Sequence, residues 1–463
     1  MDDLTDYLLN QPALKNFDFI ECRQERAQTI AVNITEDGLK DLVFNEDNGL
    51  SVRLLKNGLW FFTFITNPTR TSLENILEKD FFKIEPAYIK RLELYDTKGY
   101  VDNVEVKASQ TILNVNIDDV ADIPLSVYRE LNSLRNGEYS FIRSFNILFN
   151  STYKQTIYSN NQGSKIIQSY PFNRLNINLT GLKNGKQGRA SETVGGVRGL
   201  EAFKDGGKWS SSALLSRSIN RVKNILNGSQ PPKGIQPVVM DPSMTGTLIH
   251  EAFGHLCEAD LVMAGGVITP QQIGKKIAHE NVTITDEPLN IDGGWVPYDQ
   301  EGVRGDKSIL VEKGILKNFM VNREYAKIFN QPPKGNARAA SYRYPPIIRM
   351  RNTYLKSGDH SFEEMIEDIE TGVYVEKFIG GQASLLGTFQ FAAQVGWLIE
   401  GGELKNPLRD VSISGSTFET LMSMDAVGKN FETDIGTCGK GQLVIVGDGG
   451  PAVRVPRLIV GGV

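Results

Sequence analysis

The sequence has little of several features that would each define a class of protein. It has three cysteines in 463 residues, which is too few for a disulfide framework in a chain of this length. No apolar run reaches the length of a membrane span, and the run Leu59–Ile65 is short enough to predict a buried strand instead. No block of Lys and Arg stands out and the net charge is −5, so the chain lacks the electrostatic footprint of a nucleic-acid-binding protein.

The N-terminus also lacks a targeting pattern. It opens Met1-Asp2-Asp3-Leu4, whereas a secretory signal peptide would begin basic and continue apolar. We therefore expect a cytoplasmic protein with no membrane association. What is present is ordinary globular composition, 40% hydrophobic and 23% charged, and the length favours two or three domains.

The first half of the chain alternates strand and helix patterns. Thr29–Val32 and Leu50–Leu54 predict strands, Asn57-Gly58 predicts a hairpin turn, and helical periodicity follows over Pro124–Arg135. The Gly- and Lys-rich stretch Lys183–Lys208 predicts a linker or a flexible surface loop.

The second half carries many short apolar runs separated by Gly, Pro, Asn and Asp, such as Ser308–Val311 and Arg457–Val460. This pattern predicts a β-rich, barrel-like or sandwich-like domain. The fold class expected is therefore α+β. We expect an N-terminal mixed α/β domain over residues 1–200, a connecting helix or linker over 201–228, and a C-terminal β-rich domain over 229–463.

The segment most indicative of chemistry is His250-Glu251-Ala252-Phe253-Gly254-His255, which holds two of the four histidines in the chain. Val238–Met240 before it predicts a strand, and Ser243 or Thr245 is expected to cap a helix that runs to about Glu258. A single histidine is more often a hydrogen-bonded structural residue than a ligand. Two histidines with an adjacent glutamate nevertheless resemble the H-E-x-x-H pattern of zinc peptidases.

The spacing differs from that pattern by one residue. A step of five residues turns the second side chain roughly 140° from the first on a regular helix, so the two imidazoles would point in different directions. They converge only if the helix contains a π-type turn or ends early. Gly254, directly before His255, is where such a distortion costs least. The sequence therefore predicts a short, distorted active-site helix.

A catalytic zinc usually takes three protein ligands. Glu258, Cys257 and the remote Cys438 are all candidates for the third, and spacing does not choose among them. Asp299 and Glu301 form a further pair of acids, which are interpreted either as carboxylates near the substrate or as solvated loop residues.

These motifs resemble the TldD/PmbA family, also called the modulator-of-DNA-gyrase family, and in particular its catalytic, TldD-like branch. That branch is similar in having H-E-A-x-G-H-x-x-E, here His250–Glu258, and a distal Cys-Gly-Lys, here Cys438–Lys440. Between them, further segments resemble the family in the expected order: Asp299–Gly302, Gly335–Arg338, Arg351–Tyr354 and Gly387–Gln390.

The resemblance implies a peptidase that hydrolyses unfolded or extended peptides. It implies one zinc ion per active subunit, held by His250, His255 and Cys438, with Glu251 as the catalytic carboxylate and no organic cofactor. It further implies an N-terminal α/β domain, a C-terminal β-rich domain and a two-fold dimer. The dimer is either a homodimer or a heterodimer with a PmbA/TldE-like paralogue that has lost the metal motif.

Two other functions compete with this interpretation. The first is a cysteine hydrolase with Cys438 as nucleophile and a histidine as base. The second is a non-enzymatic regulator of a toxin–antitoxin or gyrase-related system, which would have no need of the histidines, the glutamate and the thiol. Nucleotide binding by Gly436–Gln442 is disfavoured, because Gln442 stands where a phosphate-binding loop needs a hydroxyl.

Overall fold

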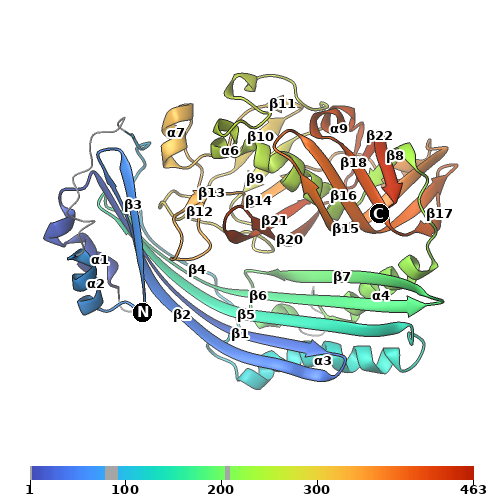
Figure 1. The fold of residues 1–463 in the computed structure, drawn as a ribbon, viewed down its shortest axis with the longest axis horizontal. Coiled ribbons are helices and arrows are strands. Elements are labelled where there is room, and N and C mark those ends of the chain that lie inside the picture. The colour runs from blue at the N-terminus through green and yellow to red at the C-terminus, as the bar shows by residue number, and fades with distance from the viewer. Residues whose placement is uncertain (1–2, 79–91, 204–208, 463) are drawn as a thin grey trace.

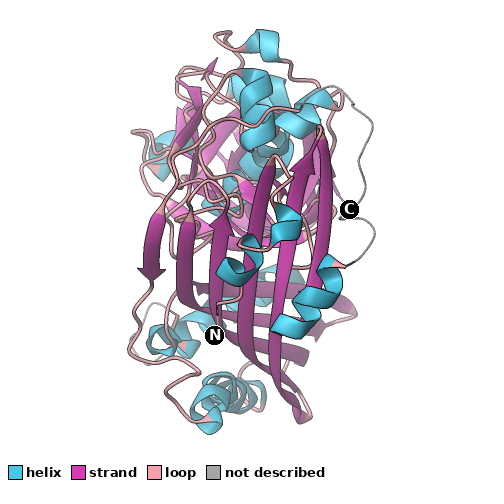
Figure 2. Ribbon diagram, turned by 90° about the vertical axis from the view of Figure 1, so that its left-hand side faces the viewer, coloured by secondary structure: helices cyan, strands magenta, loops and turns pink. Residues whose placement is uncertain are grey.

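The structure is a computed structural model that describes residues 3–78, 92–203 and 209–462. The first half of the chain forms one long curved sheet, and most of the second half lies over one face of it (Figure 1). Figure 2 shows the long strands of this sheet side by side. No helix within the described ranges is long and apolar enough to cross a membrane.

The first sheet has seven strands in the order β3-β2-β1-β5-β6-β4, and β7 pairs with β6 as well. Its strands are β1 (Phe19–Thr35), β2 (Gly38–Lys56), β3 (Leu59–Thr66), β4 (Val101–Glu105), β5 (Ile142–Asn160), β6 (Lys165–Lys183) and β7 (Lys186–Gly196). The helices of this half are α1 (Thr5–Leu9), α2 (Arg70–Leu77), α3 (Ile117–Arg135) and α4 (Ser211–Asn227), with 3₁₀ turns at Pro12–Leu14 and Leu200–Phe203.

The hairpin predicted at Asn57-Gly58 is confirmed. Lys56 pairs with Leu59, and both turn residues have positive φ, 51° and 83°, as the tight turns that suit twisted strands require. The run from Leu59 to Ile65 is indeed a strand, but it forms the edge of the sheet and is only half-buried.

The helix predicted over Pro124–Arg135 is confirmed as part of α3, which begins seven residues before Pro124 because Asn116 and Asp119 form a reciprocal cap at its N-terminus. The expectation of a linker or loop over Lys183–Lys208 is wrong for residues 186–196, which form β7 and pair with Asn173–Lys183 of β6. Gly195 lies where two backbones meet: a Cβ there would lie 2.4 Å from the carbonyl oxygen of Asn173. Residues 204–208 of that stretch lie outside the described residues.

A closed five-strand sheet confirms the barrel-like prediction for the second half. The order is β15-β8-β22-β18-β16-β17, and additional pairing of β15 with β16 closes the ring. These strands are β8 (Gly234–Met240), β15 (Thr371–Ala383), β16 (Thr388–Glu400), β17 (Glu403–Leu408), β18 (Val411–Ser416) and β22 (Val453–Gly462), and β19 (Ala426–Val427) pairs with β22.

A second sheet in this half has the order β11-β10-β9-β14-β21-β20. Its strands are β9 (Ile284–Glu287), β10 (Ser308–Glu312), β11 (Ile315–Leu316), β14 (Asn352–Leu355), β20 (Glu432–Gly439) and β21 (Leu443–Gly450), and β12 (Ala337–Arg338) pairs separately with β13 (Ile347–Ile348). The helices of this half are α5 (Pro242–Thr247), α6 (Ala259–Met263), α7 (Arg323–Phe329), α8 (Phe362–Ile366) and α9 (Thr417–Ser423), with 3₁₀ turns at Gly254–Cys257 and Pro270–Gln272.

A buried ion cluster joins the two halves. Arg53 on β2 contacts Glu21 on β1 at 2.6 Å and Glu301 from the second half at 2.7 Å, and all three side chains are at most 9% exposed. The hydroxyl of Tyr158 donates to the Glu301 carbonyl oxygen at 2.8 Å. Glu301 and its neighbour Asp299 are therefore buried, so the expectation of solvated loop acids is wrong. Burial, together with Glu301, raises the pKa of Asp299 to about 7.

Loss of the cation from this cluster should destabilise the fold. In Arg53→Ala, Glu21 and Glu301 remain buried without their partner, which costs about 3–5 kcal/mol. Urea denaturation should show the loss as a lower transition midpoint. Arg26→Ala, which breaks the exposed pair with Glu46, is the matched control and should leave the midpoint nearly unchanged. Equal midpoints for the two variants would contradict a structural role for the cluster.

Candidate metal centre

The helix that carries the two histidines starts where β8 ends. Asp241 caps α5, with its carboxylate accepting a hydrogen bond from the Met244 backbone N–H at 2.7 Å. Pro242 occupies the first helical position, where a missing N–H costs nothing. The cap is therefore Asp241, and the expectation of Ser243 or Thr245 is wrong because the helix begins earlier, at Pro242.

This helix changes type at the histidines, as the five-residue spacing predicts. α5 ends at Thr247, a π-helix covers Leu248–Phe253, and a 3₁₀ turn covers Gly254–Cys257. A π-turn brings residues five apart onto the same turn. His250 and His255 therefore meet, with ring centroids 5.4 Å apart and planes at 88°.

A glycine is required at position 254 by close packing. A Cβ there would lie 2.2 Å from the sulfur of Met350, a fully buried side chain, and 3.3 Å from the carbonyl oxygen of Ile249. The predicted distortion at Gly254 is thus confirmed, and the crowding adds a reason for glycine that the spacing alone does not give.

The third residue of the cluster comes from β20. The Cys438 sulfur lies 3.3 Å from Nε2 of His255, and ligand atoms of His250, His255 and Cys438 lie within 4.8 Å of one another. Cys438 is 2% exposed and so is His250. The fold therefore brings together the three residues that the resemblance implies as ligands.

The other two candidates for a third ligand have different positions. Cys257 packs into the apolar core, where burial raises the pKa of its thiol. Glu258 accepts a hydrogen bond from Nδ1 of His255 at 2.7 Å and lies 3.1 Å from the Lys440 ammonium. Glu258 thus fixes the far side of the His255 ring and leaves Nε2 directed at Cys438.

The two histidines have opposite electrostatics. Burial lowers the pKa of His250 well below its usual value, and the positive charges of His255, Arg349 and Arg338 lower it further. Burial would also lower the pKa of His255, but the Glu258 carboxylate and the Cys438 sulfur raise it to about 10. The site thus favours the neutral form of His250 and the positively charged form of His255.

Glu251 is the accessible member of the group. Its side chain is 41% exposed, and its carboxylate lies 3.8 Å from Nε2 of His255. That nitrogen is the one that also faces Cys438. The carboxylate is therefore positioned between the histidine pair and the solvent.

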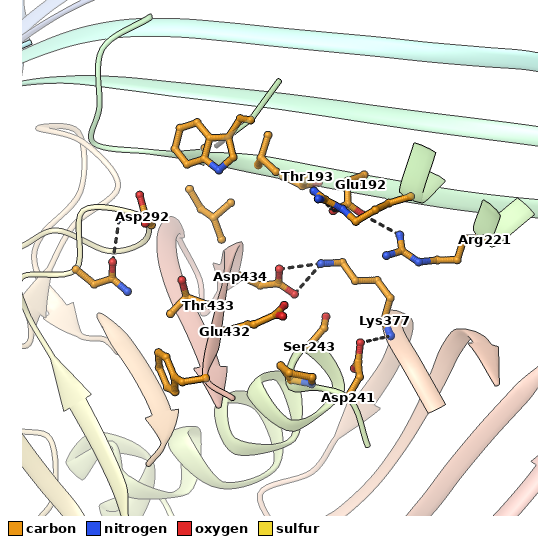
Figure 3. A pocket seen from close by; sticks show the side chains of 18 residues that line it. Glu192, Thr193, Arg221, Asp241, Ser243, Asp292, Lys377, Glu432, Thr433 and Asp434 are labelled. Atoms are coloured by element: carbon orange, nitrogen blue, oxygen red, sulfur yellow. Dashed lines mark hydrogen bonds and ion pairs between the residues drawn. The ribbon is translucent and has the colours of Figure 1, made fainter. Parts of the chain in front are cut away.

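A cavity of about 680 Å³ lies between β7 and β20 beside the start of this helix (Figure 3). Lys377 pairs with Asp434 at 2.7 Å across it, and Arg221 pairs with Glu192 at 2.7 Å. A smaller cavity of about 240 Å³ shares part of this lining and extends to Thr247 and Asp448. Burial, Asp434 and Glu251 raise the pKa of Asp448 well above its usual value, so this second cavity lies within the field of Glu251.

Sequence reasoning missed Lys440, Asp434 and Asp448 as part of this environment. One signal was available for Lys440: it follows Cys438 by two residues, and alternate residues of a strand share a face. Asp434 and Asp448 lie directly opposite each other on β20 and β21. That pairing depends on strand register, which their positions in the sequence do not reveal.

Comparison with known proteins agrees with these motifs. A family model described as the PmbA/TldA metallopeptidase C-terminal domain matches residues 233–462, and a model of domain 1 of the same metallopeptidases matches residues 20–81. A metalloprotease of Methanothermobacter thermautotrophicus is 36% identical over 450 residues, covering 96% of each chain. The zinc metalloprotease TldD homolog of Saccharolobus solfataricus is 34% identical, again covering 96% of each.

The fold is similar to that of solved structures. TldE from Thermococcus kodakarensis superimposes with a TM-score of 0.78 over 99% of each chain, at 17% sequence identity. A likeness at this level of identity concerns the architecture, which agrees with the mixed α/β fold and its closed sheet.

The close packing of α5 against β21, which supports the helix that carries the histidines, can be tested by a substitution. A Cβ on Gly246 would lie 2.6 Å from the backbone nitrogen of Gly449 on β21 and 2.9 Å from its Cα. Because backbone atoms cannot move aside as a side chain can, Gly246→Ala should cost about 1–3 kcal/mol of stability. Thermal unfolding of Gly380→Ala, whose Cβ would meet no atom within 4 Å, is the control. A Gly246→Ala variant as stable as this control would show that α5 and β21 are not in such close contact.

Proposed function

The chain belongs to the PmbA/TldD metallopeptidase family, and from this premise we propose that it hydrolyses peptide bonds with a metal ion held by His250, His255 and Cys438. Glu251 is the proposed catalytic base. The observation that carries the proposal is the convergence of two nitrogen donors and one sulfur donor within 4.8 Å, from positions 250, 255 and 438.

The surroundings of His250 fit a metal. Both of its ring nitrogens are buried and make no hydrogen bond to any residue that the structure describes. Leaving a buried polar atom without a partner costs about 1–3 kcal/mol, and a coordinated ion would supply that partner. Two imidazoles and a thiolate form a soft donor set, which favours zinc over magnesium or calcium. We therefore propose one zinc ion per active subunit.

Zinc, when bound, supplies Lewis acidity, which lowers the pKa of water from about 15.7 to about 7 and polarises a carbonyl group. Glu251 is positioned to accept the proton of the attacking water as the oxygen forms its bond to the scissile carbon. As the C–N bond breaks, the same carboxylic acid donates that proton to the leaving amine. Its exposed position beside His255 gives it access to both partners.

Glu258 and Lys440 act as positioning residues in this proposal. The Glu258 carboxylate is fully buried between His255 and the Lys440 ammonium, which also contacts Asp260 at 2.7 Å. The ammonium balances the buried negative charge, and the carboxylate holds the His255 ring in place. Such second partners orient metal-binding histidines and strengthen the binding of the metal.

The proposed substrates are unfolded or extended peptides. Within the sheets described, β7 and β20 are terminal strands, each paired on one side only. Both line the cavity of Figure 3. A free strand edge binds an extended peptide through main-chain hydrogen bonds, which select for conformation more than for sequence.

The assembly and compartment are also proposals. We propose a cytoplasmic two-fold dimer, either with a second copy of this chain or with a PmbA/TldE-like paralogue, and no association with nucleic acid. The net charge of −5 supports the last point. Light scattering of the purified chain, alone and mixed with such a paralogue, measures the mass of the assembly.

A conservative change at Glu251 separates chemistry from metal binding. Glu251→Gln keeps the size of the side chain and removes the proton acceptor, so hydrolysis of an unstructured peptide should fall by about 10²–10⁴-fold. Bound zinc should remain near that of the unmodified chain. Glu280→Gln, at an exposed residue outside the metal cluster and the cavity linings, is the control for the loss of one charge. Full activity in Glu251→Gln would refute the assignment of the base.

Elemental analysis of cysteine variants tests the ligand set. The unmodified chain should contain close to one zinc per subunit. Cys438→Ser should lose the metal, because a hydroxyl is a far weaker ligand than a thiolate. Cys257→Ser should keep the metal, since the Cys257 sulfur is not among the ligand atoms that converge within 4.8 Å. Retention of zinc by Cys438→Ser would remove the sulfur from the site.

One observation favours a second candidate function. The Cys438 sulfur lies 3.3 Å from Nε2 of His255, which is also the arrangement of a thiol nucleophile and its base. A chelator separates the two proposals. It should abolish hydrolysis by the metallopeptidase and leave a cysteine hydrolase active.

A further inference from the structure

A third cavity, of about 300 Å³, lies between the first sheet and the hairpin that carries Cys438. One wall comes from the middle of β5 and β6, and another from Thr437 and Leu443–Ile445 of the β20–β21 hairpin. Thr437 and Cys438 pair with Ile445 and Val444 across that hairpin. The cavity therefore borders the same two strands that hold the proposed sulfur ligand.

The charge of this cavity is one-sided, because its lining includes Lys154 and Arg338 but no acidic residue. Lys154 is already paired with Glu25 at 2.9 Å. Arg338, which is 9% exposed, donates only to the carbonyl oxygens of Met350 and Ile445, each at 2.6 Å. A guanidinium has five N–H donors, so three of them are left without a partner among the described residues.

Like the buried Arg349, Arg338 contacts only carbonyl oxygens among the described residues. Arg53, by contrast, contacts Glu21 and Glu301, and Arg351 contacts Asp286 at 2.7 Å. Burial and the neighbouring Arg349 lower the pKa of Arg338 to about 10, so it remains a cation at neutral pH. Its uncompensated charge is the one that an incoming anion would neutralise.

Two further features indicate what kind of anion fits. Tyr170 and Trp295 form an aromatic wall, with ring centroids 5.0 Å apart, which suits an apolar or aromatic group next to the charge. Arg174 reaches the rim, where it donates to the Thr437 hydroxyl at 2.8 Å. Within the described residues, Arg174 makes no ion pair with a carboxylate, and burial lowers the pKa of its guanidinium.

The cavity of Figure 3 has the opposite balance. Its lining includes Glu192, Asp241, Asp292, Glu432 and Asp434 against Arg217, Arg221 and Lys377, that is, five acids against three bases. A carboxylate would be repelled there and attracted by Arg338. The two cavities thus present different charges to a peptide that runs past the histidines.

We propose that the Arg338 cavity is a subsite that binds a carboxylate of the peptide substrate, with the apolar part of the same residue against Tyr170 and Trp295. This subsite rests on the proposed peptidase function. The carboxylate can be the C-terminus of the peptide or an acidic side chain. Arg338 binds it through the free N–H donors of its guanidinium.

Peptide binding to full-length, zinc-loaded Glu251→Gln protein, which should bind peptides without cleaving them, tests the subsite. The probes are three fluorescein-labelled pentapeptides that differ only at the last residue: phenylalanine with a free carboxylate, phenylalanine amide and glutamate amide. Fluorescence anisotropy should show the free carboxylate binding about 10- to 100-fold more tightly than phenylalanine amide, as a charged hydrogen bond predicts. Tight binding of glutamate amide as well would show that an acidic side chain can also supply the bound carboxylate.

Removal of the guanidinium should abolish this preference. Adding Arg338→Gln should bring the three peptides to the same affinity, and Arg338→Lys, which keeps the charge, should restore part of the difference. Equal binding of all three peptides to the parent Glu251→Gln protein would overturn the proposal, even if the Arg338 variants fail to fold. Cleavage of all three by the unmodified chain would then leave the peptidase function intact. Discrimination without any cleavage would instead refute the peptidase function.

Discussion

The site depends on one geometric constraint: two imidazoles five residues apart must face the same point. A regular helix cannot satisfy it, and the π-turn over Leu248–Phe253 does. The Asp241 cap fixes the start of α5, which leads into that turn, and Gly254 packed under Met350 fixes its end. The remaining sulfur comes from β20, and the packing of Gly246 on Gly449 of β21 holds helix and hairpin together.

Buried charge organises the region around this point. On one side, Glu258 contacts Nδ1 of His255, and the Lys440 ammonium balances the charge of the Glu258 carboxylate. Two cavities near this region differ in the sign of their charge. The cavity at β7 and β20 is mainly acidic, and the cavity at Arg338 is cationic. The same hairpin lines both cavities and carries Cys438. A peptide bound along this hairpin would therefore lie close to both the proposed metal ligands and the proposed Arg338 subsite.

Local features of this molecule could be predicted from its sequence, and features that depend on register could not. The spacing of His250 and His255 predicted the distorted helix, and short apolar runs predicted the barrel-like half. The choice of Cys438 over Cys257 needed the family resemblance, because nothing local joins positions 255 and 438. The Asp241 cap, β7 in a glycine-rich stretch and the burial of Glu301 were missed, since each depends on a partner far along the chain or on an exact helix start.

X-ray absorption at the zinc edge of the purified, zinc-loaded chain tests the central claim most directly. Two imidazole nitrogens and one sulfur from this chain predict a single sulfur at about 2.3 Å and nitrogen scatterers at about 2.0–2.1 Å. A spectrum with only nitrogen and oxygen neighbours, or with two or more sulfurs, would show that His250, His255 and Cys438 do not bind the metal together.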